Sequence, residues 1–150
     1  VLAPPVHAVG PRVAGLLPPV LQGVVVPIQD NSLRGGHVHQ DGRAVYRYAV
    51  TNMCEASQNV LNACGLDASQ IDYLLPHQAN LRIIESVTEH LGLPKEKVLV
   101  NIERYGNTTD GTLPLLLWDF EKTLKKGDKL LLTTFGGGFT WGSMYLTWDY

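Results

Sequence analysis

The regular alternation of helical and strand patterns between residues 43 and 148 most constrains how this sequence can fold. Apolar residues recur at steps of three or four in segments 43–64, 81–91 and 113–124, which predicts three amphipathic helices. Short apolar runs of strand length lie at 71–75, 98–101, 129–134 and 139–148. The predicted order is therefore helix, strand, helix, strand, helix, strand, strand.

Residues at the helix ends support this order. Gly65 and Gly92 follow the first two helices, where glycine commonly ends a helix. The third helix has Pro114 in its first turn and is followed by Gly127. Three lysines are predicted in its last turn, where positive charge is favourable: Lys122, Lys125 and Lys126.

This pattern predicts an α/β fold with a mostly parallel sheet and helices packed on it. Parallel neighbours need crossover connections, which are almost always right-handed. The glycine turn at 136–138 is too short for a crossover, so the terminal strand is expected to be antiparallel to the one before it. In such sheets the ligand crevice lies outside the carboxyl ends of the strands.

The first 40 residues differ in character from the rest. Six of the nine prolines lie in the first 34 residues, which show no sustained helical period. We expect an irregular, proline-rich segment over 1–40, with a possible short strand at 23–28, and a folded domain over 41–150. The chain begins without an initiator Met, so we also expect it to be a fragment.

Composition excludes several classes of protein. A 45% hydrophobic chain of 150 residues can bury a core, and its formal net charge of −2 argues against a nucleic-acid binder. Two cysteines cannot build a disulfide framework, so a cytoplasmic location is the simpler expectation. The apolar stretch 13–28 is broken by three prolines and is shorter than a bilayer requires, so no membrane span is expected.

Polar residues follow three of the predicted strands. These motifs are Pro76-His77-Gln78-Ala79-Asn80, Tyr105-Gly106-Asn107-Thr108 and Phe135-Gly136-Gly137-Gly138. A histidine, a carboxamide and glycine backbone N–H groups are neutral donors, suited to an oxygen that gains negative charge in thioester enolate or tetrahedral chemistry. Each motif alone is more often structural, but their coincidence at one sheet edge favours function.

Together these motifs, the first extending to Arg82-Ile83 and the third to Trp141-Gly142, resemble β-ketoacyl-[acyl-carrier-protein] synthase III. The resemblance runs from about Asp41 to Trp148. It implies the C-terminal half of a thiolase-like fold. Other branches of that fold pair two histidines, or a histidine with a cysteine near the terminal glycine turn, and neither pattern occurs here.

The resemblance also implies a reaction. Members of this family initiate fatty-acid synthesis: an acyl-CoA acylates a cysteine, and malonyl-acyl-carrier protein is decarboxylated and condensed with it to a 3-oxoacyl product. The implied class is an acyltransferase that takes acyl-CoA as a substrate and needs no cofactor or metal. A homodimer is the usual assembly in the family.

Individual roles carry over by motif position. His77 and Asn107 would hold the malonyl thioester oxygen as the enolate forms, and the Gly137 N–H would help form the oxyanion hole. Arg82 matches a basic residue associated with carrier-protein docking. The alternative, that Arg82 is simply a solvated helix residue, is equally favoured. Asp110 departs from the family, and we expect it to cap the helix that follows rather than face the site.

The family's nucleophilic cysteine belongs to the N-terminal half, and nothing in this sequence corresponds to it. Cys64 lies on an apolar helical stripe and Cys54 beside it without an activating partner, so we assign neither a catalytic role. The chain is therefore expected to be inactive alone and to need a half-domain that carries the cysteine.

Three functional interpretations stay open. In the first, the chain is part of a condensing enzyme. In the second, it is a truncated or degenerate non-catalytic half with a structural or assembly role. In the third, its hydrogen-bond donors slowly decarboxylate malonyl thioesters without a nucleophile. Metal binding by His37 and His39 is far less favoured, because the Gly-flanked pair lacks the further ligands of a zinc site.

Overall fold

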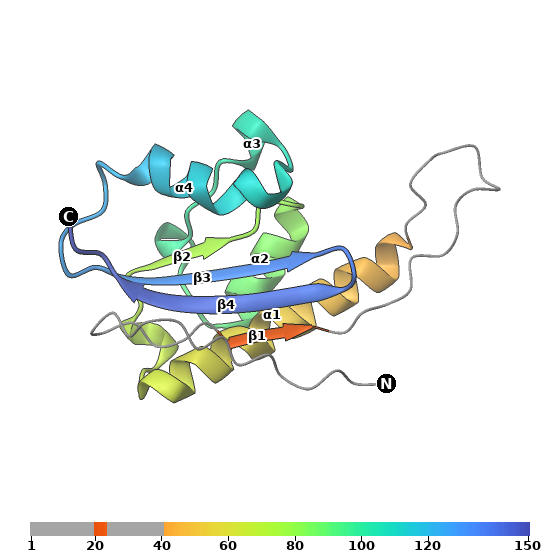
Figure 1. Cartoon of the computed structure of the whole chain (residues 1–150), viewed down its shortest axis with the longest axis horizontal. Coiled ribbons are helices and arrows are strands. Elements are labelled where there is room, and N and C mark those ends of the chain that lie inside the picture. Colours follow the sequence, from red (N-terminus) through yellow and green to blue (C-terminus); the bar gives the residue numbers. More distant parts are fainter. Residues whose placement is uncertain (1–19, 24–40) are drawn as a thin grey trace.

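The computed structural model describes residues 20–23 and 41–150. Its elements run in the order β1 (Val20–Gly23), α1 (Gly42–Cys64), η1 (Ala68–Gln70), β2 (Tyr73–Pro76), α2 (Leu81–His90), η2 (Lys95–Lys97), α3 (Ile102–Tyr105), η3 (Thr109–Gly111), α4 (Thr112–Phe120), β3 (Lys129–Gly136) and β4 (Thr140–Thr147). Figure 1 shows the strands as one sheet with helices packed against it. This confirms the predicted α/β class.

The four strands form one sheet in the order β1-β4-β3-β2. β2 pairs with β3 in parallel, whereas β4 is antiparallel to both β3 and β1. The antiparallel terminal strand is therefore confirmed. The expected predominance of parallel pairing is wrong for the described residues, since one strand pair is parallel and two are antiparallel.

The missing parallel strand is the segment predicted at 98–101. It makes a single parallel bridge between Val98 and Leu74, and the Leu99 N–H donates to the Leu74 carbonyl at 3.0 Å. Beyond that bridge, the Asn101 N–H donates to the Gln78 side chain and the chain enters α3. The segment therefore leaves the sheet before a ladder forms.

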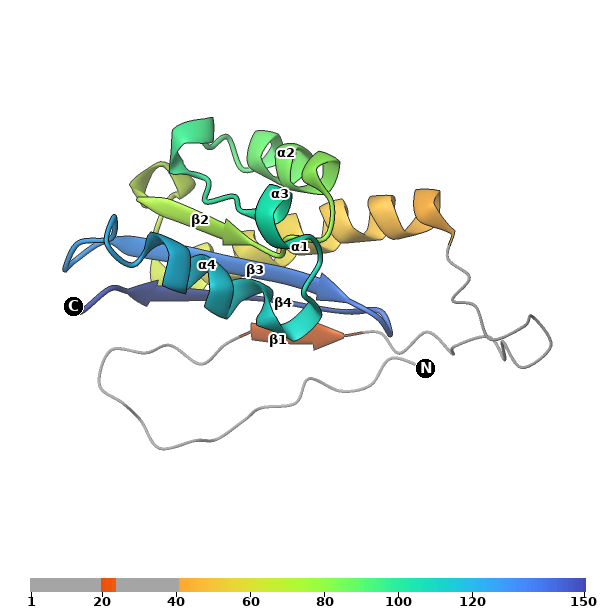
Figure 2. The same ribbon diagram turned by 90° about the horizontal axis from the view of Figure 1, so that it is seen from above.

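Apolar residues pack on both faces of the sheet. Leu74, Leu131 and Phe135 join the core formed with α1 and α2, whereas Leu75, Leu130 and Leu132 join the core that includes Leu116 of α4. Because successive strand residues point to opposite faces, α1 and α2 cover one face and α4 the other. Figure 2 shows α1 and α2 together on one side of the strands.

Helix α1 follows its predicted limits because both ends are capped. The Asp41 side chain accepts from the N–H groups of Arg43 and Ala44 at 3.0 and 3.1 Å. At the other end Gly65 adopts a left-handed conformation with φ 66° and donates to the Asn62 carbonyl. The buried side chains between the caps include Met53 and Leu61, on the predicted apolar stripe.

Helix α4 is shorter than predicted. It ends at Phe120, so the lysines expected in its last turn lie beyond it. Turns replace the helix there: the Thr123 N–H donates to the Phe120 carbonyl at 2.8 Å, and the Lys125 N–H donates to the Asp128 side chain at 2.8 Å. Leu124 is nevertheless buried, which explains why the apolar pattern continues past the helix end.

The structure describes only part of the segment to which the N-terminal predictions apply. A strand is present at Val20–Gly23, and it extends the sheet by pairing with β4. Residues 24–28, like most of the proline-rich segment 1–40, lie outside the described residues. Within the described part, no helix has the length and apolar character to cross a membrane.

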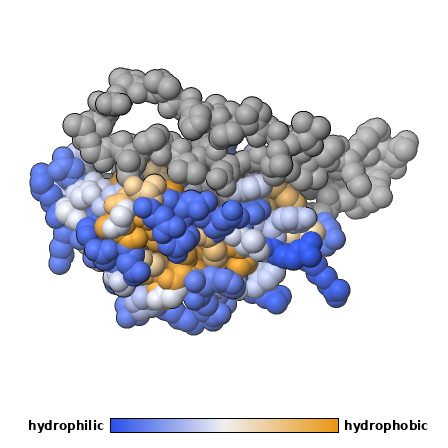
Figure 3. All heavy atoms as spheres, turned by 90° about the horizontal axis from the view of Figure 1, so that it is seen from below, coloured by the Kyte–Doolittle hydropathy of each residue, from blue (hydrophilic) through white to orange (hydrophobic). Residues whose placement is uncertain are grey.

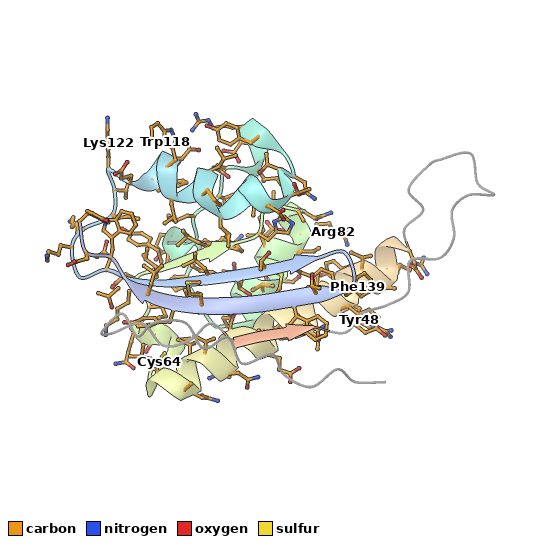
Figure 4. All side chains as sticks on the ribbon, in the orientation of Figure 1. Tyr48, Cys64, Arg82, Trp118, Lys122 and Phe139 are labelled. Atoms are coloured by element: carbon orange, nitrogen blue, oxygen red, sulfur yellow. The ribbon has the colours of Figure 1, made fainter. Side chains whose placement is uncertain are left out.

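Large apolar side chains are exposed on the described part of the chain. Trp118 of α4 is 75% exposed, and Figure 4 shows it projecting from that helix near Lys122. The view in Figure 3 shows apolar residues in the middle of another face, bordered by hydrophilic ones. Such exposure is typical of a surface that packs against further protein.

The helix cap at Gly65 provides a test of the fold. Gly65→Ala should lower the free energy of unfolding by about 1–2 kcal/mol, because an L-residue is strained in the left-handed region. The added methyl meets nothing within 4 Å at Gly65 or at Gly42, but only Gly65 has a positive φ. Gly42→Ala is therefore the matched control and should cause no loss in denaturant unfolding. Equal losses in both variants would contradict the cap.

Candidate active site

A cavity of about 500 Å³ lies at the carboxyl ends of β2 and β3. Its lining includes His77, Asn107 and Gly137, one residue from each of the three motifs that follow predicted strands. The structure thus brings together the three residues predicted at this edge. Asp110 also lines the cavity, while Arg82 does not.

His77 is fixed at the end of β2. Its backbone N–H donates to the Thr133 carbonyl of β3 at 2.8 Å, which continues the parallel ladder by one residue. The side chain is only 8% exposed, and none of the described groups hydrogen bonds with its Nδ1. Burial lowers the pKa of His77 below the usual 6.5, so the ring is mainly neutral at neutral pH.

Asn107 lies in the loop between α3 and η3 and is exposed. Its Oδ1 accepts from the Thr109 backbone N–H at 3.0 Å, a turn that asparagine commonly makes. With the oxygen engaged in this way, the Nδ2 amide is the end of the carboxamide that can donate to a ligand. The two donors therefore differ in setting: a buried ring and an exposed amide.

The glycine turn between β3 and β4 forms another part of the lining. Gly138 has φ 136°, and a side chain there would approach the Thr140 backbone nitrogen at 3.2 Å, so glycine is required. The Thr140 hydroxyl donates to the Gly137 carbonyl at 3.1 Å, which helps to fix the turn. A Cβ at Gly137 itself would meet nothing within 4 Å, so the backbone there is open to a ligand.

The position of Asp110 differs from the one predicted from the sequence. It was expected to cap the helix that follows, but the N-cap of α4 is Gly111, without a side-chain hydrogen bond. The η3 turn runs directly into α4, and the Gly111 N–H donates to the Thr108 carbonyl at 3.0 Å. Asp110 lines the cavity instead, where its negative charge raises the pKa of His77 against the larger effect of burial.

Arg82 lies beside a second hollow of about 840 Å³. This groove is bordered by Arg43 and Tyr46 of α1, and it shares Asn107 with the first cavity. The Arg82 guanidinium lies 5.8 Å from the centre of the Tyr46 ring, a cation–π contact. Arg82 is therefore placed at a neighbouring groove rather than at the cavity with His77.

The cavity also has an apolar wall, whose α1 residues the sequence pattern predicts only as core residues. Val45, Ala49 and Met53 of α1 contribute to it, together with Phe139 beyond the glycine turn. Phe139 lies 5.5 Å from the Tyr48 ring, and Figure 4 shows the two side by side. The signal was present in the sequence, since these α1 residues lie on the predicted apolar stripe.

The two cysteines lie elsewhere. Neither Cys54 nor Cys64 lines either hollow. Burial raises the pKa of Cys54 to about 11 and also raises that of Cys64, so both thiols are protonated at neutral pH. His37 and His39 lie outside the described residues. Over 20–23 and 41–150, no group of three acidic, His or Cys residues could hold a metal ion.

The described residues thus form an α/β domain that places a histidine, an asparagine and a glycine turn at one edge of its sheet. Residues 61–148, more than half of the chain, match the family model 3-oxoacyl-[acyl-carrier-protein (ACP)] synthase III C terminal. The chain belongs to this family, whose members initiate fatty-acid synthesis. The predicted resemblance is thereby confirmed.

Known relatives agree. The chain is 53% identical over 114 residues to β-ketoacyl-[acyl-carrier-protein] synthase III 1 of Bacteroides thetaiotaomicron, a match over 76% of this chain and 34% of that protein. It is also 53% identical over 114 residues to the synthase III of Phocaeicola vulgatus, with the same coverage. The chain therefore spans about a third of the length of the curated relatives it matches.

Solved structures show the same fold. Synthase III of Aquifex aeolicus is 38% identical, with a TM-score of 0.74 over 85% of this chain and 39% of that chain. The priming β-ketosynthase of the R1128 polyketide pathway has a TM-score of 0.77 over 91% of this chain and 46% of that chain, at 25% identity. These neighbours confirm the predicted thiolase-like fold.

The charge of Asp110 provides a test of the site. Asp110→Asn should lower the pKa of His77 further, because it removes the charge that opposes the effect of burial. The unfolded chain would then bind this proton still more readily than the folded chain, so stability should fall more as the pH drops below about 6.5. An NMR titration of the His77 ring measures the pKa directly. Glu96 lines neither hollow, so Glu96→Gln is the control. A rise in the pKa of His77 in Asp110→Asn would contradict the assignment.

Proposed function

We propose that this chain supplies the malonyl-binding half of a β-ketoacyl-[acyl-carrier-protein] synthase III active site, with residues 41–150 as the thiolase-like domain. One observation carries the proposal: His77, Asn107 and Gly137 line a single cavity in which burial keeps the imidazole neutral. Neutral donors suit a thioester oxygen that becomes anionic during the reaction.

In the proposed reaction, malonyl-acyl-carrier protein loses its carboxylate as carbon dioxide. The electron pair of the broken C–C bond passes into an enolate, whose oxygen accepts hydrogen bonds from the His77 ring and the Asn107 Nδ2. The carbanion then attacks an acyl group held as a cysteine thioester, and the cysteine thiolate leaves. The Gly137 N–H would stabilise the oxyanion formed at that acyl carbon.

Carrier docking is proposed for the groove beside Arg82. Arg43 and Arg82 border it, and Asn107 connects it with the cavity that holds His77. Positive side chains at the entrance would attract an acidic carrier and guide its thioester toward the two donors. The acyl donor would be an acyl-CoA, as in the family.

The acyl-cysteine must come from outside this set of residues. Both thiols are protonated and lie away from the cavity, whereas a cysteine nucleophile reacts as the thiolate. The exposed Trp118 supports packing against a cysteine-bearing N-terminal half. The same observations also fit the second candidate, a half that keeps the fold and serves in assembly without turnover.

A chimeric enzyme tests the proposal. The matched 114-residue region of the Bacteroides thetaiotaomicron synthase is replaced by its counterpart from this chain, so that the relative supplies the rest. Condensation of acetyl-CoA with malonyl-acyl-carrier protein, together with an acyl adduct seen by mass spectrometry, would support the first candidate. A folded chimera that forms neither product nor carbon dioxide would reject it in favour of a non-catalytic half.

Substitution of either donor should slow this chimera. We expect His77→Ala and Asn107→Ala each to reduce the rate of malonyl decarboxylation by about 10²–10³-fold, the usual loss when one such donor is removed. His90→Ala and Asn62→Ala change exposed residues of α2 and α1 and serve as matched controls. A loss below about threefold in either donor variant, measured as released carbon dioxide, would contradict the assigned roles.

A further inference from the structure

Gln78, next to His77, is a buried polar residue that the mechanism above does not use. It is 1% exposed, and both ends of its carboxamide are hydrogen bonded. Its Oε1 accepts from the N–H groups of Asn101 and Ile102, each at 3.0 Å. Its Nε2 donates to the Pro76 carbonyl at 2.8 Å, with the Leu99 carbonyl at 3.5 Å.

The Gln78 backbone adds a third connection. Its N–H donates to the Thr112 hydroxyl at 2.9 Å, at the start of α4. The segment that carries Asn107 is therefore held at Ile102, five residues before it, and at Thr112, five residues after it. Both attachments lead to the residue that directly follows His77. The two proposed donors are thus connected through one buried side chain and its own backbone.

Asp119 of α4 holds the same segment from its other side. Its carboxylate accepts from the Asn101 Nδ2 at 2.8 Å, from Arg104 at 3.1 Å and from the Tyr105 hydroxyl at 3.0 Å. These hydrogen bonds lower the pKa of Asp119. Asn101 therefore contacts Gln78 through its backbone and Asp119 through its side chain, so α3 is fixed between the two.

We propose that Gln78 is a positioning residue, which sets the position of Asn107 relative to His77. This inference rests on the proposed function, because it concerns the two donors assigned there. A carboxamide is suited to the task because it accepts two N–H groups at one end and donates to carbonyls at the other. A methionine of similar length can do neither, and it would leave two N–H groups, one buried and one partly buried, without a partner.

The test measures malonyl decarboxylation in the active chimera that carries Gln78→Met. We expect kcat to fall about 10–100-fold per folded molecule, because misplacement of a donor by about 1 Å is costly. KM should change less than kcat, since Arg43 and Arg82 of the groove are untouched. Gln58→Met is the matched control: Gln58 is an exposed glutamine of α1 that contacts Asn62, so its loss should leave kcat unchanged.

A second measurement does not depend on turnover. NMR on the whole 150-residue chain should show a cross-relaxation contact between the His77 ring and the Asn107 carboxamide, and this contact should weaken in Gln78→Met but not in Gln58→Met. If Gln78→Met does not fold, Thr112→Val tests the anchor at the other end of the segment, because it removes the oxygen that accepts from the Gln78 N–H.

The outcomes separate the two proposals. Loss of kcat with KM retained, or loss of the NMR contact, supports positioning by Gln78. An unchanged kcat per folded molecule together with an unchanged contact overturns it, whichever variant is used. If the parent chimera shows no decarboxylation at all, the proposed function fails, and the NMR contact alone decides whether Gln78 positions Asn107.

Discussion

The parallel pairing of β2 with β3 is the constraint on which the rest of the structure depends. It continues past the strand, where the His77 N–H donates to the Thr133 carbonyl at 2.8 Å. This hydrogen bond places the imidazole at the edge where β3 gives way to the glycine turn. Thr133 is itself fixed, because its hydroxyl donates to the Met53 carbonyl of α1 and accepts from Ser143 of β4. The position of His77 is thus determined by the core of the sheet.

The site combines burial with exposure. Burial keeps the His77 ring neutral, and the nearby charge of Asp110 opposes this only in part. Asn107 remains exposed, so its position depends on anchors at both ends of its segment rather than on packing. Gln78 supplies an anchor at each end, through its side chain before Asn107 and through its backbone N–H at Thr112. Asp119 of α4 adds hydrogen bonds to the part before Asn107. In the proposed site, the placement of the two donors therefore depends on hydrogen bonds that do not touch the substrate.

The sequence predicted most of the fold and the edge at which the site lies. Helix α1 was found because its apolar stripe and the Gly65 cap are local signals, and the site edge because parallel strands align their carboxyl ends. The segment at 98–101 was wrongly predicted as a strand. Its apolar residues are partly or fully buried, as in a strand, but the segment makes only one bridge to the sheet. Hydrogen bonding to Gln78 then directs the chain away from the sheet. Asp110 was misplaced for a similar reason: whether a carboxylate caps a helix depends on the turn before it. The proposed role of Gln78 had no local signal, since Asn101, Ile102 and Thr112, which it anchors, lie more than twenty residues away.

The most direct measurement is a crystal structure of the chimera with a non-hydrolysable malonyl thioester analogue. We predict that the thioester carbonyl oxygen lies about 3 Å from both a ring nitrogen of His77 and the Nδ2 of Asn107. We also predict that the part of the analogue that stands for the carrier side of the thioester passes along the groove beside Arg82. An oxygen bound by only one of the two donors, or an analogue seated away from both, would contradict the central claim.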